Sequence, residues 1–525
     1  MKAQLFYSVF RNIYLTRLIR NQIFKDQIID VVDLQYLNHN HVYLSSILDK
    51  GSSVFVKLKI QRNEFHQYKD NSYYYMINYL VLDLKQDESE CFDLTLVPKS
   101  VCRLSIIIDQ HTQVNGILPD TITDLEIKSV NILDHSFVVE SMVSKLPKNI
   151  KRLAIPYNYR FKWSGPIVLP LSLDDFEYFC LYQDAKRLVI DKSKVFASAQ
   201  VQVNRIEELN WVYGQKWVQN IHVRGCPDGM LGSQTPGHIK RMNILNYKPD
   251  TIHKDFLPRG LKHLQLHYLG SLSEDFLPPS LTYLKVSFFN QELESNYLPG
   301  HLKTLYLLNF EKPIRCSVLG LSVFPPGLHF LYLPKFNQPL TMGCLPESLA
   351  VLKLMSYNQP LGPFVLPRQL KILELDSYTH PLVNDCLPSC LTHLQLPSFK
   401  GSFESIGPLN HLQSLTVFKL NHTVTPTISN VKDLQLMFDE IQDWELEINL
   451  QNTSIKRLAI FITGKDRFLS RNLLPFGLVK LKINGFKIET SEIIPTSCIY
   501  LETDIIDINP DLIPASVKYY KYRCL

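Results

Sequence analysis

The sequence predicts a repeat solenoid, mainly β, in which coils of about 21 residues stack through a ladder of parallel strands. Two observations lead to this prediction. The stretch that begins at Pro346 returns with little change at Pro367. An apolar residue also recurs from Leu266 to Val417, at steps of 20, 21, 26, 21, 21, 21 and 21 residues. Spacing this regular indicates one structural unit repeated along the chain.

Residues 1–60 are predicted to form a helical N-terminal cap. Phe6, Val9, Phe10 and Ile13 are spaced so that they share one face of a helix. A solenoid needs such a cap because the first coil would otherwise expose its apolar edge to water.

The repeat array is predicted to run over residues 97–525, with residues 61–96 as a transition into it. The copies are clearest over residues 256–404 and hardest to assign over residues 171–235. The single step of 26 residues contains a five-residue insertion near Arg315–Ser322, which predicts a bulging loop.

Each coil carries the pattern Leu-x-x-Leu-x-Leu after an opening proline. Alternate residues of a strand face the same side, so the residues six and eight positions after the proline should point inward. The residues five, seven and nine positions after it should point outward. The proline cannot donate to a strand ladder and belongs just outside the strand. The return to the next proline is too short and too interrupted for a helix, so an extended return is expected.

A tetrapeptide follows the strand, and it carries a family resemblance. Residues 336–339 are Phe-Asn-Gln-Pro and residues 357–360 are Tyr-Asn-Gln-Pro. The pattern resembles the FNIP repeat, a relative of the leucine-rich repeat, with Phe or Tyr where the leucine-rich repeat keeps Asn or Cys. The match is specific over residues 256–404 and looser over residues 97–255 and 405–525. The resemblance implies leucine-rich-repeat-like coils and a non-enzymatic protein–protein interaction scaffold without a cofactor.

The resemblance also leaves a second function open. In some relatives such arrays follow an F-box, which docks onto a cullin–RING ubiquitin ligase, so the chain could be a substrate receptor of such a ligase. The Leu-Pro with which F-boxes usually open is absent, and no proline precedes Pro98. A degenerate F-box-like segment within residues 1–60 therefore stands as the alternative to a simple cap.

Composition argues against several other classes of protein. The net charge is only +5 over 525 residues, which is too weak to indicate nucleic-acid or membrane binding. No apolar run approaches the roughly 20 residues needed to cross a bilayer. The start of the chain meets Arg11 too soon for a signal peptide, and the ten cysteines are scattered. A cytoplasmic protein with a protein partner is expected, although the sequence does not identify that partner.

Two pairs of possible metal ligands occur in the clear repeats. His263 and His267 have a spacing that suits zinc on a helix, but they fall on a predicted strand and turn. Cys386 and Cys390 have no second ligand pair, and Cys386 shares its repeat position with Cys344. The two histidines are therefore predicted to be exposed polar residues, and the cysteine at the position of Cys386 a small core residue, so neither a metal nor a cofactor is expected.

A carboxylate cluster near the end of the chain keeps an enzyme as a remote alternative. Asp504, Asp507 and Asp511 lie close together in sequence, and β-helix enzymes that act on carbohydrates use carboxylates on one face of a similar repeat. The cluster falls in a terminal coil, and each repeat shows one clear strand rather than three. No catalytic residue is predicted.

The outward strand positions provide the candidate partner-binding residues. Stacked at strand spacing, they would merge into one aromatic and aliphatic strip, and such patches often mark interfaces. Strand propensity alone also favours aromatic and β-branched residues, so the composition has a second explanation. The candidates are Tyr283, Thr304, Tyr306, Phe330, Tyr332, Val351, Met355 and Ile372.

Overall fold

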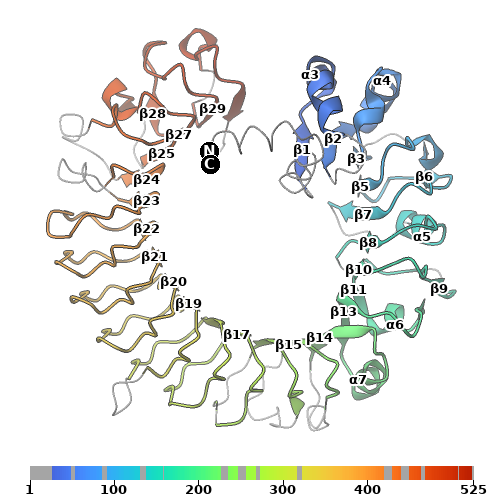
Figure 1. The fold of residues 1–525 in the computed structure, drawn as a ribbon, viewed down its shortest axis with the longest axis horizontal. Coiled ribbons are helices and arrows are strands. Elements are labelled where there is room, and N and C mark those ends of the chain that lie inside the picture. The colour runs from blue at the N-terminus through green and yellow to red at the C-terminus, as the bar shows by residue number, and fades with distance from the viewer. Residues whose placement is uncertain are drawn as a thin grey trace, which may run out of the picture. The chain divides into compact units, whose positions relative to one another are not determined.

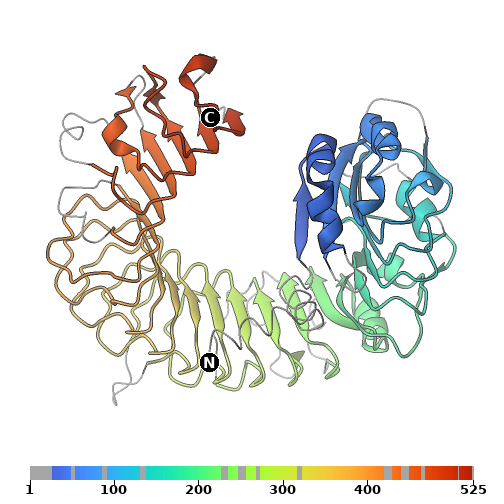
Figure 2. The ribbon, with the colours of Figure 1, turned by 45° about the horizontal axis from the view of Figure 1, so that its top comes forward.

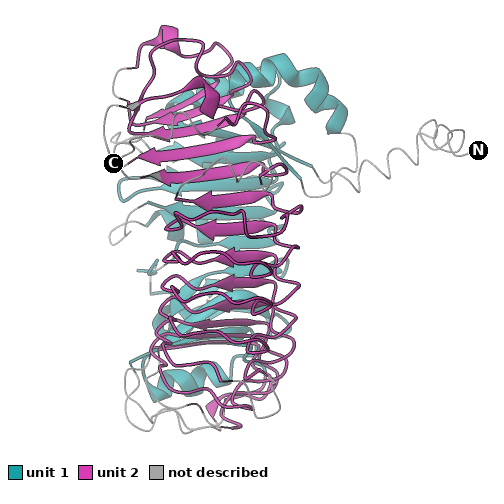
Figure 3. Ribbon diagram, turned by 90° about the vertical axis from the view of Figure 1, so that its left-hand side faces the viewer, with its two compact units in different colours: residues 1–226, 238–241 teal, residues 227–237, 242–525 magenta. Residues whose placement is uncertain are grey.

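The computed structural model forms two compact units (Figure 3), namely residues 1–226 with 238–241 and residues 227–237 with 242–525. The residues that it describes are 27–48, 54–85, 91–130, 137–157, 159–162, 164–225, 235–245, 256–267, 272, 274–315, 322–418, 428–438, 449–462, 467–505 and 508–522.

Unit 1 is built on a parallel sheet with the strand order β1-β2-β3-β5-β7-β8-β10. Its strands are β1 (Ile28–Val31), β2 (Phe55–Gln61), β3 (Tyr79–Asp83), β4 (Phe92–Asp93), β5 (Arg103–Ile108), β6 (Val114–Asn115), β7 (Asp124–Ser129), β8 (Arg152–Ala154), β9 (Ile167–Val168), β10 (Asp175–Glu177), β11 (Phe179–Leu181), β12 (Leu188–Val189), β13 (Phe196–Val203) and β14 (Val218–Arg224). Its helices are α3 (Leu34–Ile47), α4 (Phe65–Asp70), α5 (Val138–Val143), α6 (Tyr182–Ala185) and α7 (Ile206–Tyr213). Within the described part of the chain, none of the helices has the length and apolar character needed to cross a membrane.

In unit 2 the strands of successive coils lie side by side in chain order (Figures 1 and 2). They are β15 (Arg241–Leu245), β16 (His263–Leu266), β17 (Tyr283–Val286), β18 (Thr304–Leu307), β19 (Phe330–Tyr332), β20 (Val351–Lys353), β21 (Ile372–Glu374), β22 (His393–Leu396), β23 (Ser414–Val417), β24 (Asp433–Phe438), β25 (Arg457–Ile462), β27 (Lys480–Asn484), β29 (Tyr500–Thr503) and β30 (Tyr519–Tyr522). Strands β26 (Arg467–Phe468) and β28 (Phe486–Lys487) form a separate pair.

The predicted fold class, a parallel-strand solenoid, is confirmed. The register places Leu284 beside Leu305, Leu305 beside Leu331 and Leu331 beside Leu352, and each of these leucines is fully buried. The neighbours of each leucine on its own strand are only half-buried. Inward and outward positions therefore alternate along the strands, as the sequence predicts. The predicted bulging insertion at Arg315–Ser322 lies largely outside the described residues.

The strand ladder of unit 1 begins upstream of residue 97, where the sequence predicts the array to start. β2 pairs in parallel with β3, and β3 pairs in parallel with β5. The buried residues Val56, Leu58 and Ile60 alternate along β2 without an opening proline, so this coil lacks the signal that marks the later ones. Within residues 1–60, predicted as a helical cap, the structure describes helix α3 but also strand β1, which pairs in parallel with β2. The predicted helical face at Phe6–Ile13 lies outside the described residues.

The aromatic residue of the Phe-Asn-x-Pro tetrapeptide forms a stacked row inside the array. The ring of Phe310 lies 6.1 Å from Phe289 and 6.2 Å from Phe336, and Phe336 lies 6.2 Å from Tyr357, with all three pairs nearly parallel. These four rings are fully buried. The repeat therefore needs a flat side chain here, because only a ring can stack on the same ring of the next coil.

The asparagine of the tetrapeptide connects each coil to the next. The Oδ1 atom of Asn337 accepts a hydrogen bond of 2.8 Å from the backbone N–H of Asn358. Asn358 in turn accepts one of 3.0 Å from the N–H of Thr379, and Asn290 accepts one of 3.0 Å from Glu311. This exposed ladder satisfies backbone donors that the turn would otherwise leave unpaired.

A small hydroxyl-bearing residue two positions after the opening proline makes a further link between coils. The hydroxyl of Ser280 donates to the carbonyl oxygens of Arg259 and Leu261, at 2.6 and 2.7 Å. Cys390 takes the same position, and its thiol lies 2.8 Å from the carbonyl oxygen of Arg368. Cys390 is thus part of the coil-to-coil contacts.

In five coils of the described part of the chain, a residue with positive φ lies three positions before the opening proline. These residues are Asp275, Asn296, Gly343, Phe364 and Asp385, with φ of 61°, 81°, 84°, 59° and 58°. Gly, Asn and Asp tolerate this conformation, whereas a bulky side chain is strained in it. Phe364 is therefore the exception among these five residues, and its side chain is 52% exposed.

Candidate protein-binding surface

The structure brings seven of the eight predicted residues onto one face of unit 2. Five of them form a single row across strands β17 to β21, in which each residue is the register partner of the next. In chain order this row is Tyr283, Thr304, Phe330, Val351 and Ile372. A second row contains Tyr306 and Tyr332, which are register partners on β18 and β19. Met355 is half-buried in the turn that follows β20. We call this set of eight residues the strip.

Aromatic rings are concentrated at one end of the strip. The ring of Tyr306 lies 4.9 Å from Phe330, 5.6 Å from Tyr283 and 5.6 Å from Tyr332. Each of these rings is half-buried, because its neighbours cover one side and leave the other accessible. Burial, together with nearby Tyr306, raises the pKa of Tyr283, which reinforces the neutral form that a tyrosine already has near pH 7. The cluster thus presents uncharged, amphipathic rings to the outside of the sheet.

The aliphatic end of the strip is bordered by charged side chains. Lys353 and Glu374 are register partners and form an ion pair of 2.8 Å. Asp376 follows Glu374 on the same side of the chain and accepts a hydrogen bond of 3.0 Å from Gln395. Burial, with a smaller contribution from Glu374, raises the pKa of Asp376 above its usual value. This end therefore carries one more carboxylate than it has lysines.

The corresponding face of unit 1 has a different chemistry. Arg103, Asp124 and Arg152 are register partners on β5, β7 and β8. Asp124 lies 2.8 Å from Arg103 and 3.0 Å from Arg152, and Arg152 also lies 2.7 Å from Glu177. These outward side chains satisfy one another electrostatically, whereas those of the strip do not form ion pairs.

The last coils of unit 2 again carry paired charges on this face. Arg457 on β25 pairs with Asp433 on β24, and Lys482 lies 3.2 Å from Glu502. Burial acts to raise the pKa of Glu502, but hydrogen bonds from Tyr500 and Lys482 outweigh it and lower that pKa. Two hollows of about 460 and 240 Å³ lie among these side chains.

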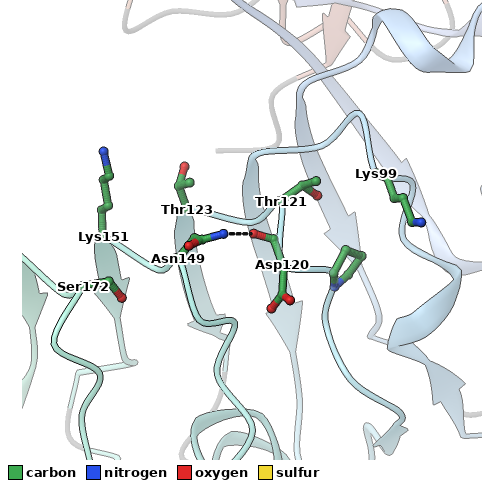
Figure 4. Close-up of a pocket in the computed structure, with 8 residues that line it drawn as sticks. Lys99, Asp120, Thr121, Thr123, Asn149, Lys151 and Ser172 are labelled. Atoms are coloured by element: carbon green, nitrogen blue, oxygen red, sulfur yellow. Dashed lines mark hydrogen bonds between the residues drawn. The ribbon is translucent and has the colours of Figure 1, made fainter.

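A larger hollow, of about 770 Å³, lies in unit 1 at the turns that precede its strands (Figure 4). Lys99, Thr121, Lys151 and Ser172 are among its lining residues. Its polar groups already serve the fold: Thr121 donates to the carbonyl of Val101, and Ser172 donates to that of Lys148. None of those lining residues offers a buried polar group that could bind a ligand. The strip therefore remains the better candidate surface.

The two histidines of the possible zinc pair lie at the margin of the strip. The ring of His263 lies 5.5 Å from Tyr283, and the ring of His267 lies 5.9 Å from Phe288. Burial and the positive charge of Lys285 lower the pKa of His267. Both rings are half-buried against aromatic neighbours, which differs from the exposed positions that the sequence predicts.

The cysteines singled out by sequence occupy structural positions. Cys344 and Cys386 are fully buried, and burial raises the pKa of the Cys386 thiol. Within the described ranges no three His, Cys, Asp or Glu side chains gather as metal ligands would.

The acidic cluster near the end of the chain is only partly described. Asp504 accepts a hydrogen bond of 3.1 Å from the backbone N–H of Gly485, and Asp511 is exposed in a short 3-10 turn. Asp507 lies outside the described residues. The Asp504 side chain thus has a structural role, because it stabilises a turn of the neighbouring coil.

Comparisons with known proteins agree with this architecture. The sequence model of the family described as FNIP Repeat matches residues 249–288, 319–356, 336–377 and 357–399. Over this part of its length the chain carries FNIP repeats, as the tetrapeptides predict.

Two solved structures are similar at lower levels. The chain is 21% identical to CroV588, described as a novel circular leucine-rich-repeat protein, with a TM-score of 0.48, and the match covers 88% of this chain and 68% of that one. It is 12% identical to a chain of the Toll–Spatzle complex from Drosophila, with a TM-score of 0.32, and that match covers 92% of this chain and 64% of the other. No curated protein matches the sequence.

Proposed function

We propose that the chain is a non-enzymatic scaffold that binds another protein through the strip. The observation that carries this proposal is the cluster around Tyr306, in which three further aromatic rings lie within 5.6 Å on the outer face of the sheet. Tyrosine and phenylalanine supply large contact areas at interfaces and lose little conformational entropy on binding. Self-paired charges on the outward face of unit 1 make that face a weaker candidate.

The cluster is not the main contact that holds the coils together. The core beneath it consists of fully buried leucines, and the stacked row of rings lies elsewhere in each coil. The exposed side of each ring in the cluster therefore contributes little to folding, and a partner that covers it would remove apolar area from water.

The test is affinity purification with the native chain and with the double variant Tyr306→Ala/Phe330→Ala. The proposal predicts that the variant folds and loses a partner that the native chain retains. A matched control, Ser414→Ala/Thr416→Ala, changes the same two rows on β23 and should retain the partner. The purified partner should then bind the native chain and the control directly. Equal recovery on the native chain and the double aromatic variant would count against the strip.

A further inference from the structure

The way in which a partner can approach the strip is limited by the strand ladder. Each of the strands β17 to β21 is paired on both edges. A partner therefore cannot extend this part of the sheet by adding a strand to it. Recognition at the strip must use side chains, and a bound segment that contacts the whole strip must cross the strands.

The two ends of that path carry opposite charges. Lys285 on β17 shares its row with Gln265 on one side and Tyr306 on the other, and both of these neighbours are uncharged. At the far end, Asp376 follows β21. Lys353 forms an ion pair with Glu374 and also lies near Asp376, so this end carries two carboxylates and one lysine. The apolar centre of the strip thus lies between a positive end and a negative end.

The length of this path follows from the strand spacing. Four steps of about 4.8 Å separate β17 from β21, so the charged ends lie about 19 Å apart along the sheet. An extended peptide covers this distance with about six residues at about 3.3 Å each. A helix covers it with about thirteen residues at about 1.5 Å each.

We propose that the strip binds a peptide segment of a partner protein that is acidic at one end, apolar in the middle and basic at the other end. The acidic side chain lies against Lys285, aromatic or aliphatic side chains cover Tyr306 and Phe330, and the basic side chain lies against Asp376. This inference rests on the proposed function, since it names the kind of segment that the same surface would bind. Charge complementarity of this kind fixes the direction in which a segment lies and excludes segments of the wrong sign.

A library of random 16-residue peptides displayed on phage tests the proposal with the full chain as bait. Peptides selected on the native chain should carry acidic and basic residues on opposite sides of an apolar stretch. Selection on Lys285→Glu should replace the acidic end by a basic one, and selection on Asp376→Lys should replace the basic end by an acidic one. The best native clone should bind each charge-reversed variant about tenfold more weakly.

Two control variants, Lys303→Glu and Glu404→Lys, make the same changes of charge at exposed positions outside the strip. They should leave the selected sequences and the affinity unchanged, and circular dichroism should show that every bait is folded. Peptides that need Tyr306 and Phe330 but show no charge preference would overturn the inference and leave the proposed function intact. A selection without peptides that depend on these two rings would overturn both.

Discussion

Replacing Phe336 by alanine is predicted to destabilise the central coils of unit 2. The ring is fully buried between Phe310 and Tyr357, at 6.2 Å from each. Truncating a buried phenylalanine costs about 3–5 kcal/mol. Since two stacked contacts disappear together, at about 0.5–1.5 kcal/mol each beyond simple burial, the loss should lie near the upper end, at about 5 kcal/mol.

Two companion variants separate the parts of this effect. Phe336→Leu keeps most of the apolar burial and loses the stacking, so it should cost about 1–3 kcal/mol. Gln338→Ala changes the variable position of the same tetrapeptide, where a surface substitution should stay within about 0.5 kcal/mol. The order of the three variants therefore reports on stacking rather than on damage to the tetrapeptide as a whole.

Hydrogen exchange read by mass spectrometry is the appropriate assay, because a repeat array can open in segments rather than in one step. Phe336→Ala should accelerate exchange in peptides that cover β18 to β20 far more than in peptides that cover β27. If Phe336→Ala and Gln338→Ala exchanged alike in β18 to β20, the stacked row would not hold the coils together and the reasoning would be refuted.

Three further variants have defined outcomes. Asn337→Ala should cost about 1 kcal/mol and speed exchange of the Asn358 amide about fivefold, and unchanged exchange would exclude the asparagine link. Phe364→Asn should raise the unfolding midpoint, since it relieves about 1 kcal/mol of strain at positive φ and exposes no core; a lower midpoint would contradict this. Asp376→Asn should stabilise the chain at pH 7, because burial raises the pKa of Asp376 in the folded state, so its ionised form costs stability as pH rises. The gain should vanish as pH falls below the usual value of 3.8, and a gain that persists there would reject this explanation.

The fold could be predicted from the sequence because one period sets both the stacking and the side of each residue. Once Leu331 is inward, Phe330 and Tyr332 must be outward, and the register of neighbouring coils follows from the equal repeat lengths. This is why the strip could be named in advance. The same reasoning does not predict the coils that contain β2 and β3, since their residues alternate between apolar and polar without the proline that marks the period.

Other features depend on geometry that the pattern does not encode. The hydrogen bond from Asn358 to Asn337 needs the exact path of the turn, and the positive φ of Phe364 becomes visible only through the backbone. The charged ends of the strip were missed because Lys285 and Asp376 look like ordinary polar positions when each coil is considered alone. Their arrangement would have emerged from sequence by aligning all coils and comparing charge along each row.

The central claim is that successive coils stack in parallel register and so gather the strip on one face. The most direct measurement is the distance between spin labels at His263 and His393, which six register steps connect on this face. Because the chain contains ten cysteines, the labels should be carried by a noncanonical amino acid. At about 4.8 Å per step the account predicts a narrow distribution near 29 Å. A broad distribution, or one centred far beyond that distance, would contradict it.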